Sequence, residues 1–489
     1  MIILRSDFDK TVTIPSRISH NLQVKKTSSV RTMSYSYHPK DWGLKVSQNG
    51  ELMVGNHGVV GLARKFGTPL HVVNESRLLK TAQKFLESAS SLFPAKTSVH
   101  YAFKCNSVPA VVQTVRSAGL NAEVMTEYEL ELAVRLGFLP DQIIVNGPCK
   151  TNEFLRACVW TRVRLIVVDS IDELRALAGI TRELMLGAHI LLRINPDVVP
   201  RKMNRGTATG SRKGCAFGLD LKGGEVGIAF DVLKEMELVR FEGFHFHIGT
   251  GIRDPRDYAR SFTRMRSLFE QARSMGFPVR VLDVGGGFAS MTTREFTTAE
   301  MLAYHGLEVL PKSAVRADCA SFDDFAGEVS RAVLRQFPLD DLPELVYEPG
   351  RCIVSPNQFL LLTVHRVKDR WGIRKWLITD GGLSTVAMPT YYEYHEVFLA
   401  NDVGRPRTEK VTIIGPACFA GDVVYRNKLM PEVHPGEILA IMDSGAYFTA
   451  LESSFGFPRP AIVSVNGSTC RLIRTRETFD EMVARDILD

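Results

Sequence analysis

From residue 68 to residue 287, short apolar runs rich in β-branched residues alternate with stretches of helical periodicity. This alternation is typical of successive βα units, which build a parallel sheet. The chain contains eight such runs: TPLHVVN (68–74), SVHYAFK (98–104), NAEVMT (121–126), QIIVNG (142–147), RLIVVDS (164–170), HILLRIN (189–195), FEGFHFHIG (241–249) and VRVLDVGGG (279–287). Eight units predict a closed (β/α)8 barrel of the TIM type, whose reactive side chains follow the carboxyl ends of the strands.

After about residue 335 the pattern changes to strands separated by Gly, Pro and charged turns, among them ELVYEPGRCIV, FLLLTVHRVKDR and EILAIMDSGAY. These strands predict a mainly antiparallel C-terminal β domain over residues 336–489. We therefore expect the barrel over residues 67–335, with 36–66 contributing a strand and a helix to the β domain. Residues 289–335 contain helical patterns and should bridge the two domains.

Residues 10–40 are rich in Ser, Thr and basic residues, contain no Asp or Glu and show no sustained periodicity, which predicts a disordered tail over residues 1–35. A transit peptide would share this composition. The simpler interpretation is a flexible tail, or an upstream start with Met33 as the working initiator.

Composition excludes several classes of protein. The chain has 489 residues, 45% hydrophobic and 23% charged, and its net charge of +6 is spread over many residues. The sequence lacks the basic stripe of a nucleic-acid binder, an apolar run of membrane-spanning length and the apolar core of a secretory signal. The eight cysteines have no zinc-site spacing. We expect no metal site and free thiols in the cytoplasm.

Three local features suggest a cofactor. Lys104 ends the second run and would face the barrel mouth, where its amine can form an imine with a carbonyl group. The eighth run leads into Gly285-Gly286-Gly287, whose NH groups can approach a phosphate because no Cβ intervenes. Glu348-Pro-Gly-Arg351 pairs a carboxylate with a guanidinium. Alone, each has an ordinary structural explanation: a solvated lysine, a tight turn and an ion pair.

Six ordered motifs resemble those of the fold-type III pyridoxal-phosphate (PLP) decarboxylases, the family of diaminopimelate and ornithine decarboxylases: YAFKCN, FHFHIGTG, LDVGGGF, EPGR, GPACFAGD and GAY. The resemblance covers roughly residues 50–475. It implies a carboxy-lyase with an alanine racemase-like fold that removes the α-carboxyl group of an amino acid. A protonated pyridine ring would accept the electrons left by CO₂.

The resemblance also implies roles for individual residues. Lys104 would be the Schiff-base lysine, His247 would stack on the cofactor ring and Glu348 would keep the ring nitrogen protonated. Arg193 would contact the phenolic oxygen of the cofactor. The phosphate would be held by Thr250, where the family generally has serine, and by Gly286, Gly287, Arg351 and Tyr447. Taken alone, His247 would be an ordinary core histidine.

Two residues are implied to act across a subunit boundary. In the family, the residues matching Cys418 and Asp422 reach the active site of the neighbouring subunit, which implies a homodimer with shared active sites. Cys418 or Lys104 would return a proton to Cα after CO₂ leaves. As an isolated residue, Cys418 would be a small buried side chain.

The positions that select the substrate depart from the family. Phe419 stands where diaminopimelate and ornithine decarboxylases have an acid, and Met388 where the former have an arginine. Tyr392 falls near a second acid of the ornithine group, although Glu393 could shift into that register. With Asp422, these residues predict a distal pocket that is larger or less charged than a diamine site. We therefore predict a conjugated or modified amino acid as substrate, as in siderophore or other specialised biosynthesis.

Other functions stay open on the sequence alone. The alternative substrates are free diaminopimelate, ornithine and lysine. A PLP racemase would have an arginine where this chain has Glu348. A non-catalytic homologue that regulates a decarboxylase would lose cofactor contacts that this chain keeps.

Overall fold

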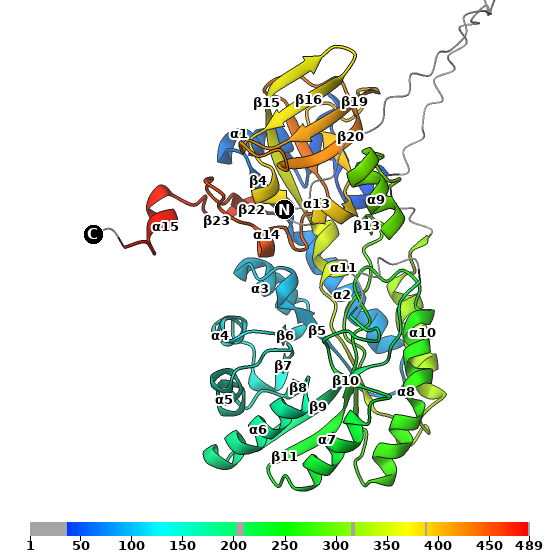
Figure 1. Ribbon diagram of the computed structural model, residues 1–489. Helices are drawn as coiled ribbons and strands as arrows, with labels where there is room; N and C mark the ends of the chain where they lie inside the picture. Colours follow the sequence, from blue (N-terminus) through cyan, green and yellow to red (C-terminus); the bar gives the residue numbers. More distant parts are fainter. Residues whose placement is uncertain (1–36, 202–209, 314–317, 387–388, 488–489) are drawn as a thin grey trace, which may run out of the picture. The chain divides into compact units, whose positions relative to one another are not determined.

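The computed structural model describes residues 37–201, 210–313, 318–386 and 389–487. Eight parallel strands close into a barrel, as predicted (Figure 1). Their order is β9-β11-β12-β14-β5-β6-β7-β8, and β8 pairs back to β9. The strands are β5 (Thr97–Ala102), β6 (Asn121–Val124), β7 (Ile143–Val145), β8 (Leu165–Val168), β9 (Ala188–Asn195), β11 (Val239–His245), β12 (Val281–Asp283) and β14 (Glu344–Tyr347), with β10 (Leu219–Asp220) added beside β9.

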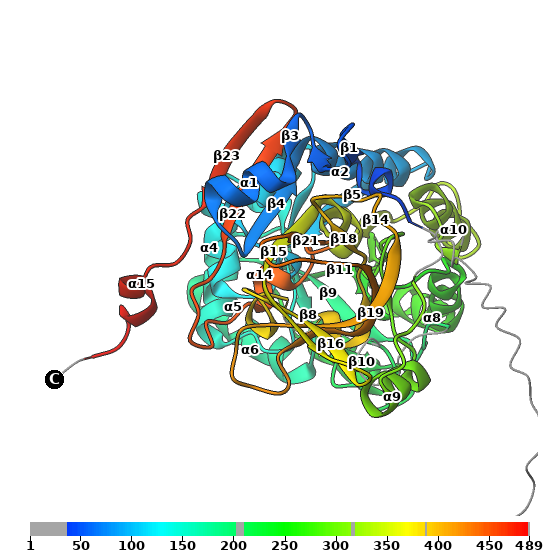
Figure 2. The ribbon, with the colours of Figure 1, turned by 90° about the horizontal axis from the view of Figure 1, so that it is seen from above.

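Helices surround the barrel strands (Figure 2). They are α2 (Glu75–Ser91), α3 (Pro109–Ser117), α4 (Glu127–Arg135), α5 (Asn152–Thr161), α6 (Ile171–Leu184), α7 (Glu225–Lys234), α8 (Arg256–Ser274) and α10 (Phe322–Leu334). Several begin where a side-chain oxygen accepts a backbone N–H three residues ahead, as at Asn74, Thr126, Thr151, Ser170 and Ser321. The barrel interior is filled by Ile144, Leu165, Val167, Leu191, Val281 and Val346, so that it is a packed core.

Two strands lie in a different domain from the one that the sequence predicted. The run at 68–74 forms β4 (Leu70–Asn74), which pairs with strands of the β domain, whereas ELVY forms β14 and closes the barrel between β12 and β5. β4 is buried at every position, and a strand covered on both faces has the same apolar pattern in either domain. The barrel therefore begins with helix α2 and continues to Tyr347.

The β domain is a mixed, mainly antiparallel sheet of order β20-β19-β16-β15-β4-β22-β23. The strand pairs β16–β19 and β22–β4 are parallel. Its strands are β15 (Gln358–Arg370), β16 (Arg374–Thr379), β19 (Arg407–Ile414), β20 (Val423–Pro431), β22 (Ala461–Asn466) and β23 (Thr469–Arg474), with β21 (Ile438–Ile441) and β18 (Val397–Leu399) pairing beside β15.

Shorter elements connect the two parts. The segment with β1 (Lys45–Val46), β2 (Leu52–Val54), β3 (His57–Gly58) and α1 (Val59–Phe66) packs in one hydrophobic cluster with strands of the β domain. β13 (Arg294–Glu295) pairs with β17 (Glu393–Tyr394), and α9 (Thr298–Leu307) packs beside them, whereas α10 covers the barrel. The remaining short helices are α11 (Arg351–Val354), α12 (Leu383–Val386), α13 (Pro389–Tyr392), α14 (Phe448–Leu451) and α15 (Phe479–Val483).

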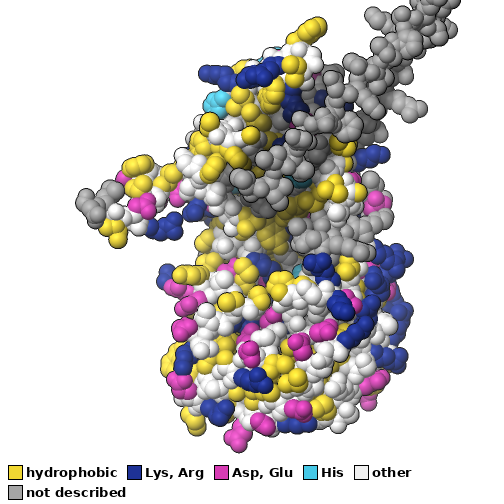
Figure 3. Space-filling view, in the orientation of Figure 1, with side chains coloured by type: hydrophobic (Ala, Val, Ile, Leu, Met, Phe, Trp, Pro, Cys, Tyr) yellow, Lys and Arg dark blue, Asp and Glu magenta, His cyan; other side chains and the backbone are white. Residues whose placement is uncertain are grey.

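The surface of the barrel carries charges of both signs, interspersed over the face seen in Figure 3. Within the described ranges, no helix is long and apolar enough to cross a membrane. The tail predicted for residues 1–35 lies outside the described residues.

Two buried histidines predict a loss of stability in mild acid. Burial and Arg474 lower the pKa of His71 to about 3, and burial and Arg164 lower that of His100 to about 4. Below pH 6.5 these two histidines bind protons in the unfolded chain but not in the folded chain, so the folded state loses stability as pH falls. We expect about 1 kcal/mol per histidine between pH 6.5 and 5.5.

Urea unfolding at several pH values measures this effect. His71→Gln should flatten the dependence of the unfolding free energy on pH, whereas His434→Gln, which changes an exposed side chain, should leave it as in the wild type. A dependence that is unchanged in His71→Gln would contradict the prediction.

Candidate active site

A cavity of about 310 Å³ lies at the carboxyl ends of the barrel strands. Its walls bring together residues that are far apart in the sequence: Lys104, Met125, Asn146, Gly147, Pro148, Arg193, Gly210, Phe217, His245, His247, Gly249, Thr250, Glu348 and Tyr447. Six of the predicted site residues are among them. Reactive groups occupy this end of the barrel in TIM-type enzymes, so the cavity is the candidate active site.

Lys104 enters the cavity from the short turn that follows β5. Its Nζ lies 2.8 Å from Oε2 of Glu123, a buried residue of the neighbouring strand β6. Burial alone would lower the pKa of Lys104, but the carboxylates of Glu123 and Glu348 outweigh it and raise the pKa. The amine is therefore cationic in the free protein, and Glu123 is its counterion.

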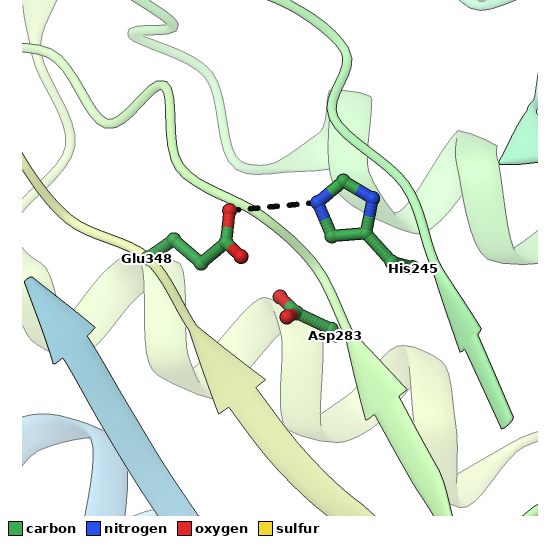
Figure 4. Close-up of side chains that lie close together, drawn as sticks. All are labelled: His245, Asp283 and Glu348. Carbon is green, nitrogen blue, oxygen red and sulfur yellow. Dashed lines mark ion pairs between the residues drawn. The ribbon is translucent and has the colours of Figure 1, made fainter. Parts of the chain in front are cut away.

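Glu348 follows β14, and the side chains of His245 and Asp283 lie beside it (Figure 4). Asn146 Nδ2 donates to Oε1 at 2.5 Å, and His245 Nε2 lies 3.4 Å from Oε2. One ring nitrogen of His245 and one carboxylate oxygen each of Asp283 and Glu348 lie within 4.8 Å of one another. The Asp283 Oδ2 atom and both ring nitrogens of His245 are buried without a hydrogen-bond partner in the described structure.

The two carboxyl groups of this cluster have opposite protonation states. Burial alone would raise the pKa of Glu348, but His245 and Lys104 hold it well below its usual range. Burial and the charge of Glu348 raise the pKa of Asp283 well above its usual range. Glu348 is thus the anion and Asp283 the protonated acid, as expected for two carboxyl groups that share one site.

The glycine segment after β12 leaves no room for side chains. A Cβ added at Gly286 would lie 2.3 Å from the carbonyl oxygen of Glu348, and one at Gly287, where φ is +97°, would lie 2.1 Å from that of Gly249. The Gly286 N–H donates to Nδ1 of His247 at 3.2 Å. The backbone can therefore approach a ligand closely here.

Arg351, at the start of α11, is held by contacts on three sides. Its Nη1 lies 2.6 Å from Oε1 of Glu393, its Nε donates to Thr250 Oγ1 at 3.2 Å, and its Cζ lies 5.0 Å from the centre of the Tyr447 ring. Tyr447 has a φ of +65°, an unusual conformation for a bulky residue, and such strain is concentrated at functional sites. Its N–H donates to the carbonyl oxygen of Cys105, next to Lys104, at 2.9 Å.

Arg193 and His247 line another part of the cavity. Arg193 Nη1 lies 3.2 Å from Oδ1 of Asp169, and its guanidinium lies over the ring of Phe217. Burial, Arg193 and Lys104 lower the pKa of His247 to about 3. His247 is therefore neutral and can lie against an aromatic ring without introducing charge.

Of the predicted residues in the C-terminal part of the chain, Tyr447 lines this cavity, whereas Cys418, Phe419, Asp422 and Tyr392 do not. Cys418 is exposed and Phe419 is half exposed, in the loop between β19 and β20. Asp422 is buried, and its carboxylate accepts the N–H groups of Leu383 at 2.6 Å and Ala417 at 2.7 Å, which holds this loop together. Tyr392 lies near Arg351 and Glu393, whereas Met388 lies outside the described residues.

The sequence contained a signal for the residues that the predictions missed. Glu123, Asn146, His245 and Asp283 are polar residues within or directly after apolar strands. Such polar residues rarely occupy positions in a buried strand without a hydrogen-bond partner or a ligand. Their positions in the sequence indicate that they reach the same end of the parallel sheet. Only the closed barrel shows that Asn146, His245 and Asp283 surround Glu348.

These features fit a phosphorylated pyridine aldehyde. The cavity offers an amine, an anionic carboxylate with unpartnered polar atoms beside it, and a backbone that a Cβ would obstruct. Residues 55–355 match the family model described as "Pyridoxal-dependent decarboxylase, pyridoxal binding domain". The chain belongs to this family of pyridoxal-dependent decarboxylases. It is therefore a PLP-dependent amino-acid decarboxylase, and its cofactor is pyridoxal 5'-phosphate.

Relatives in this family extend over nearly the whole chain. A diaminopimelate decarboxylase of Bacillus subtilis is 30% identical over 446 residues, which are 90% of this chain and 96% of the relative. One from Methanocaldococcus jannaschii is 29% identical over 449 residues, with the same coverage. A crystal structure of diaminopimelate decarboxylase from M. jannaschii, determined with L-lysine, has a TM-score of 0.79 and 27% identity, and covers 91% of this chain and 98% of its own.

Proposed function

We propose that the substrate of this decarboxylase is a free diamino acid of the diaminopimelate, ornithine or lysine class. The relatives over 90% of the chain are diaminopimelate decarboxylases, and one of them binds L-lysine. The cavity of about 310 Å³ is also at the lower end of the range for small-ligand sites. These findings support the smaller substrates over the conjugated amino acid that the aromatic residues had suggested, and nothing supports siderophore biosynthesis.

The observation that carries the proposed chemistry is that Glu348, whose pKa is held below its usual range, faces the same cavity as the Lys104 amine. When bound, the cofactor supplies an electron-accepting ring for the pair of electrons left by the departing carboxyl group. Glu348 would keep the ring nitrogen protonated, because its own pKa is depressed and Asn146 and His245 fix its position. A carboxylate with an imidazole can also bind a metal ion, but membership of the pyridoxal-dependent family supports the pyridine nitrogen as the partner of Glu348.

The remaining residues would bind and orient the cofactor. We assign the cofactor to Lys104, with His247 against the ring and Arg193 at the phenolic oxygen. The phosphate would lie against Gly286 and Gly287, with Thr250, Arg351 and Tyr447 beside it. The amine of Lys104, which lines the same cavity, would be the first candidate to return a proton to Cα.

We further propose a homodimer in which Cys418 completes the site of the partner. Within one protomer, Cys418 and Phe419 are exposed and do not line the cavity. Exposure of an aromatic residue beside a cysteine is consistent with a surface that another subunit covers. Cys418 would then be the second candidate for the proton donor. All eight cysteines are free thiols, which supports a reducing compartment such as the cytoplasm.

A substrate panel tests the proposed substrate class. We expect CO₂ release from at least one of meso-diaminopimelate, L-lysine and L-ornithine, and a loss of about 10²-fold or more in kcat/KM when the distal amine is acylated. A substrate that binds through a charged hydrogen bond loses that contact on acylation. Turnover of acylated derivatives alone would support the conjugated substrate instead.

A further inference from the structure

Glu295 is a partly buried residue whose carboxyl group has none of the assigned roles. Both of its carboxylate oxygens are shielded from solvent and have no hydrogen-bond partner within the described part of the chain. Burial raises its pKa to about 8, with the charge of Glu393 adding to that effect and Arg351 opposing it. An unpartnered buried carboxyl group is costly, so its retention calls for a ligand.

Glu295 lies beside the candidate active site. A Cβ added at Gly251, the residue after cavity-lining Thr250, would lie 3.3 Å from Glu295 Oε1. The side chain also belongs to the electrostatic environment of Tyr392, together with Glu393 and Arg351. The sequence motifs gave no role to Glu295, because it lies between the glycine segment and the β domain.

Glu295 and Glu393 face each other across a two-residue sheet. They are directly opposite in the antiparallel pair β13–β17, so their side chains leave the same face. Like charges at such positions destabilise a sheet. We call these two residues the acid pair.

The acid pair lies beside Arg351, whose guanidinium is already engaged. Arg351 forms an ion pair with Glu393 at 2.6 Å, and Glu393 also lies 3.1 Å from His395 Nε2. A cofactor phosphate next to Thr250 and Arg351 would add further negative charge. A positive group on the ligand would therefore stabilise the ionised form of Glu295.

We propose that Glu295 binds the distal ammonium group of the substrate, with Glu393 behind it. This inference rests on the proposed diamino-acid substrate and names the residue that distinguishes such a substrate from an amino acid with an uncharged side chain. The incoming ammonium would favour ionisation of Glu295 and give its oxygens their missing partner. Glu295 is thus a specificity residue and takes no part in breaking the Cα–carboxyl bond.

Binding of amines to the PLP-loaded protein tests the proposal without requiring turnover. We would compare 1,5-diaminopentane with 1-aminopentane by isothermal titration calorimetry, in the wild type and in Glu295→Gln. The wild type should bind the diamine about 10- to 100-fold more tightly than the monoamine, and Glu295→Gln should bind the two about equally. Glu295→Asp should restore part of the preference.

Glu300→Gln is the matched control. Glu300 and Glu295 both line a second cavity, together with Gly251. The carboxylate of Glu300 is already paired with Arg294 at 2.7 Å, and glutamine can keep its helix-capping contact. This variant should keep the wild-type preference for the diamine. An equal preference in the wild type and Glu295→Gln would overturn the proposal, and so would a loss of cofactor affinity in Glu295→Gln that accounts for the whole effect.

Measurements of CO₂ release separate the two proposals. A diamine preference that depends on Glu295, without release of CO₂ from any diamino acid of the panel, would refute the proposed substrate class and retain the ammonium site. Release of CO₂ with a kcat/KM for L-lysine that does not fall at least about tenfold in Glu295→Gln would refute the ammonium site and retain the substrate class.

Discussion

Replacement of Lys104 by alanine is expected to lower the rate of decarboxylation by about 10³-fold or more. Among the described residues that line the cavity, Lys104 is the one with a primary amine, 2.8 Å from its counterion Glu123. Its removal therefore takes from this lining the amine needed for covalent attachment of the cofactor. CO₂ release at saturating PLP measures the loss. Borohydride reduction followed by peptide mass spectrometry should find the cofactor on residue 104 in the wild type.

Lys96→Ala is the control for this experiment. Lys96 precedes β5, at the opposite end of the strand that Lys104 follows, and its largely exposed side chain pairs with Glu344. Its loss should leave kcat within about twofold, as for most surface substitutions. Cofactor trapped on another lysine, or a Lys104→Ala variant with more than about a tenth of wild-type activity, would contradict the assignment.

Replacement of Glu348 by glutamine is expected to reduce kcat by about 10²- to 10³-fold while the cofactor stays attached to Lys104. An amide has no charge with which to keep a ring nitrogen protonated, although it fits the space between Asn146 and His245. Since the pKa of Glu348 is held below its usual range, its carboxylate stays ionised as pH falls from 8 to 5. Titration of Glu348 should therefore cause no loss of wild-type activity over that range.

Glu344→Gln provides a matched control on the same strand. Glu344 lies at the amino end of β14 and pairs with Arg164 and Lys96, whereas Glu348 follows its carboxyl end. The amino end of a barrel contributes stability and the carboxyl end contributes chemistry. Glu344→Gln should lower the unfolding temperature and keep kcat. Equal losses of kcat in the two variants would refute the role of Glu348.

Much of the barrel could be predicted from the sequence because its strands are short apolar runs at regular intervals. The exceptions, β4 and β14, have a physical cause. Both strands are almost entirely buried, and burial on both faces removes the alternation that would distinguish a parallel barrel strand from the centre of an antiparallel sheet. The turn that follows ELVY contains Pro349 and Gly350, which suggested a β-domain strand and in fact ends the last barrel strand.

The site was predictable where a motif marks a residue, and less so where only the fold brings residues together. Lys104, His247 and Glu348 lie in motifs and line one cavity. The pairing of Arg351 with Glu393 depends on contact between α11 and β17, which no spacing along the chain reveals. Glu295 was missed for the same reason, since its importance comes from the residue opposite it.

The order of the strands along the chain also limits how this protein can be assembled. Strand β4 is made early, yet Val73 pairs with Gln358 and with Ser464, near the other end of the polypeptide. During synthesis, both edges of β4 stay unpaired until nearly the whole barrel has left the ribosome. In that time β4 can pair with incorrect strands. Shortened chains that end before β22 should therefore be poor starting points for isolating the barrel alone.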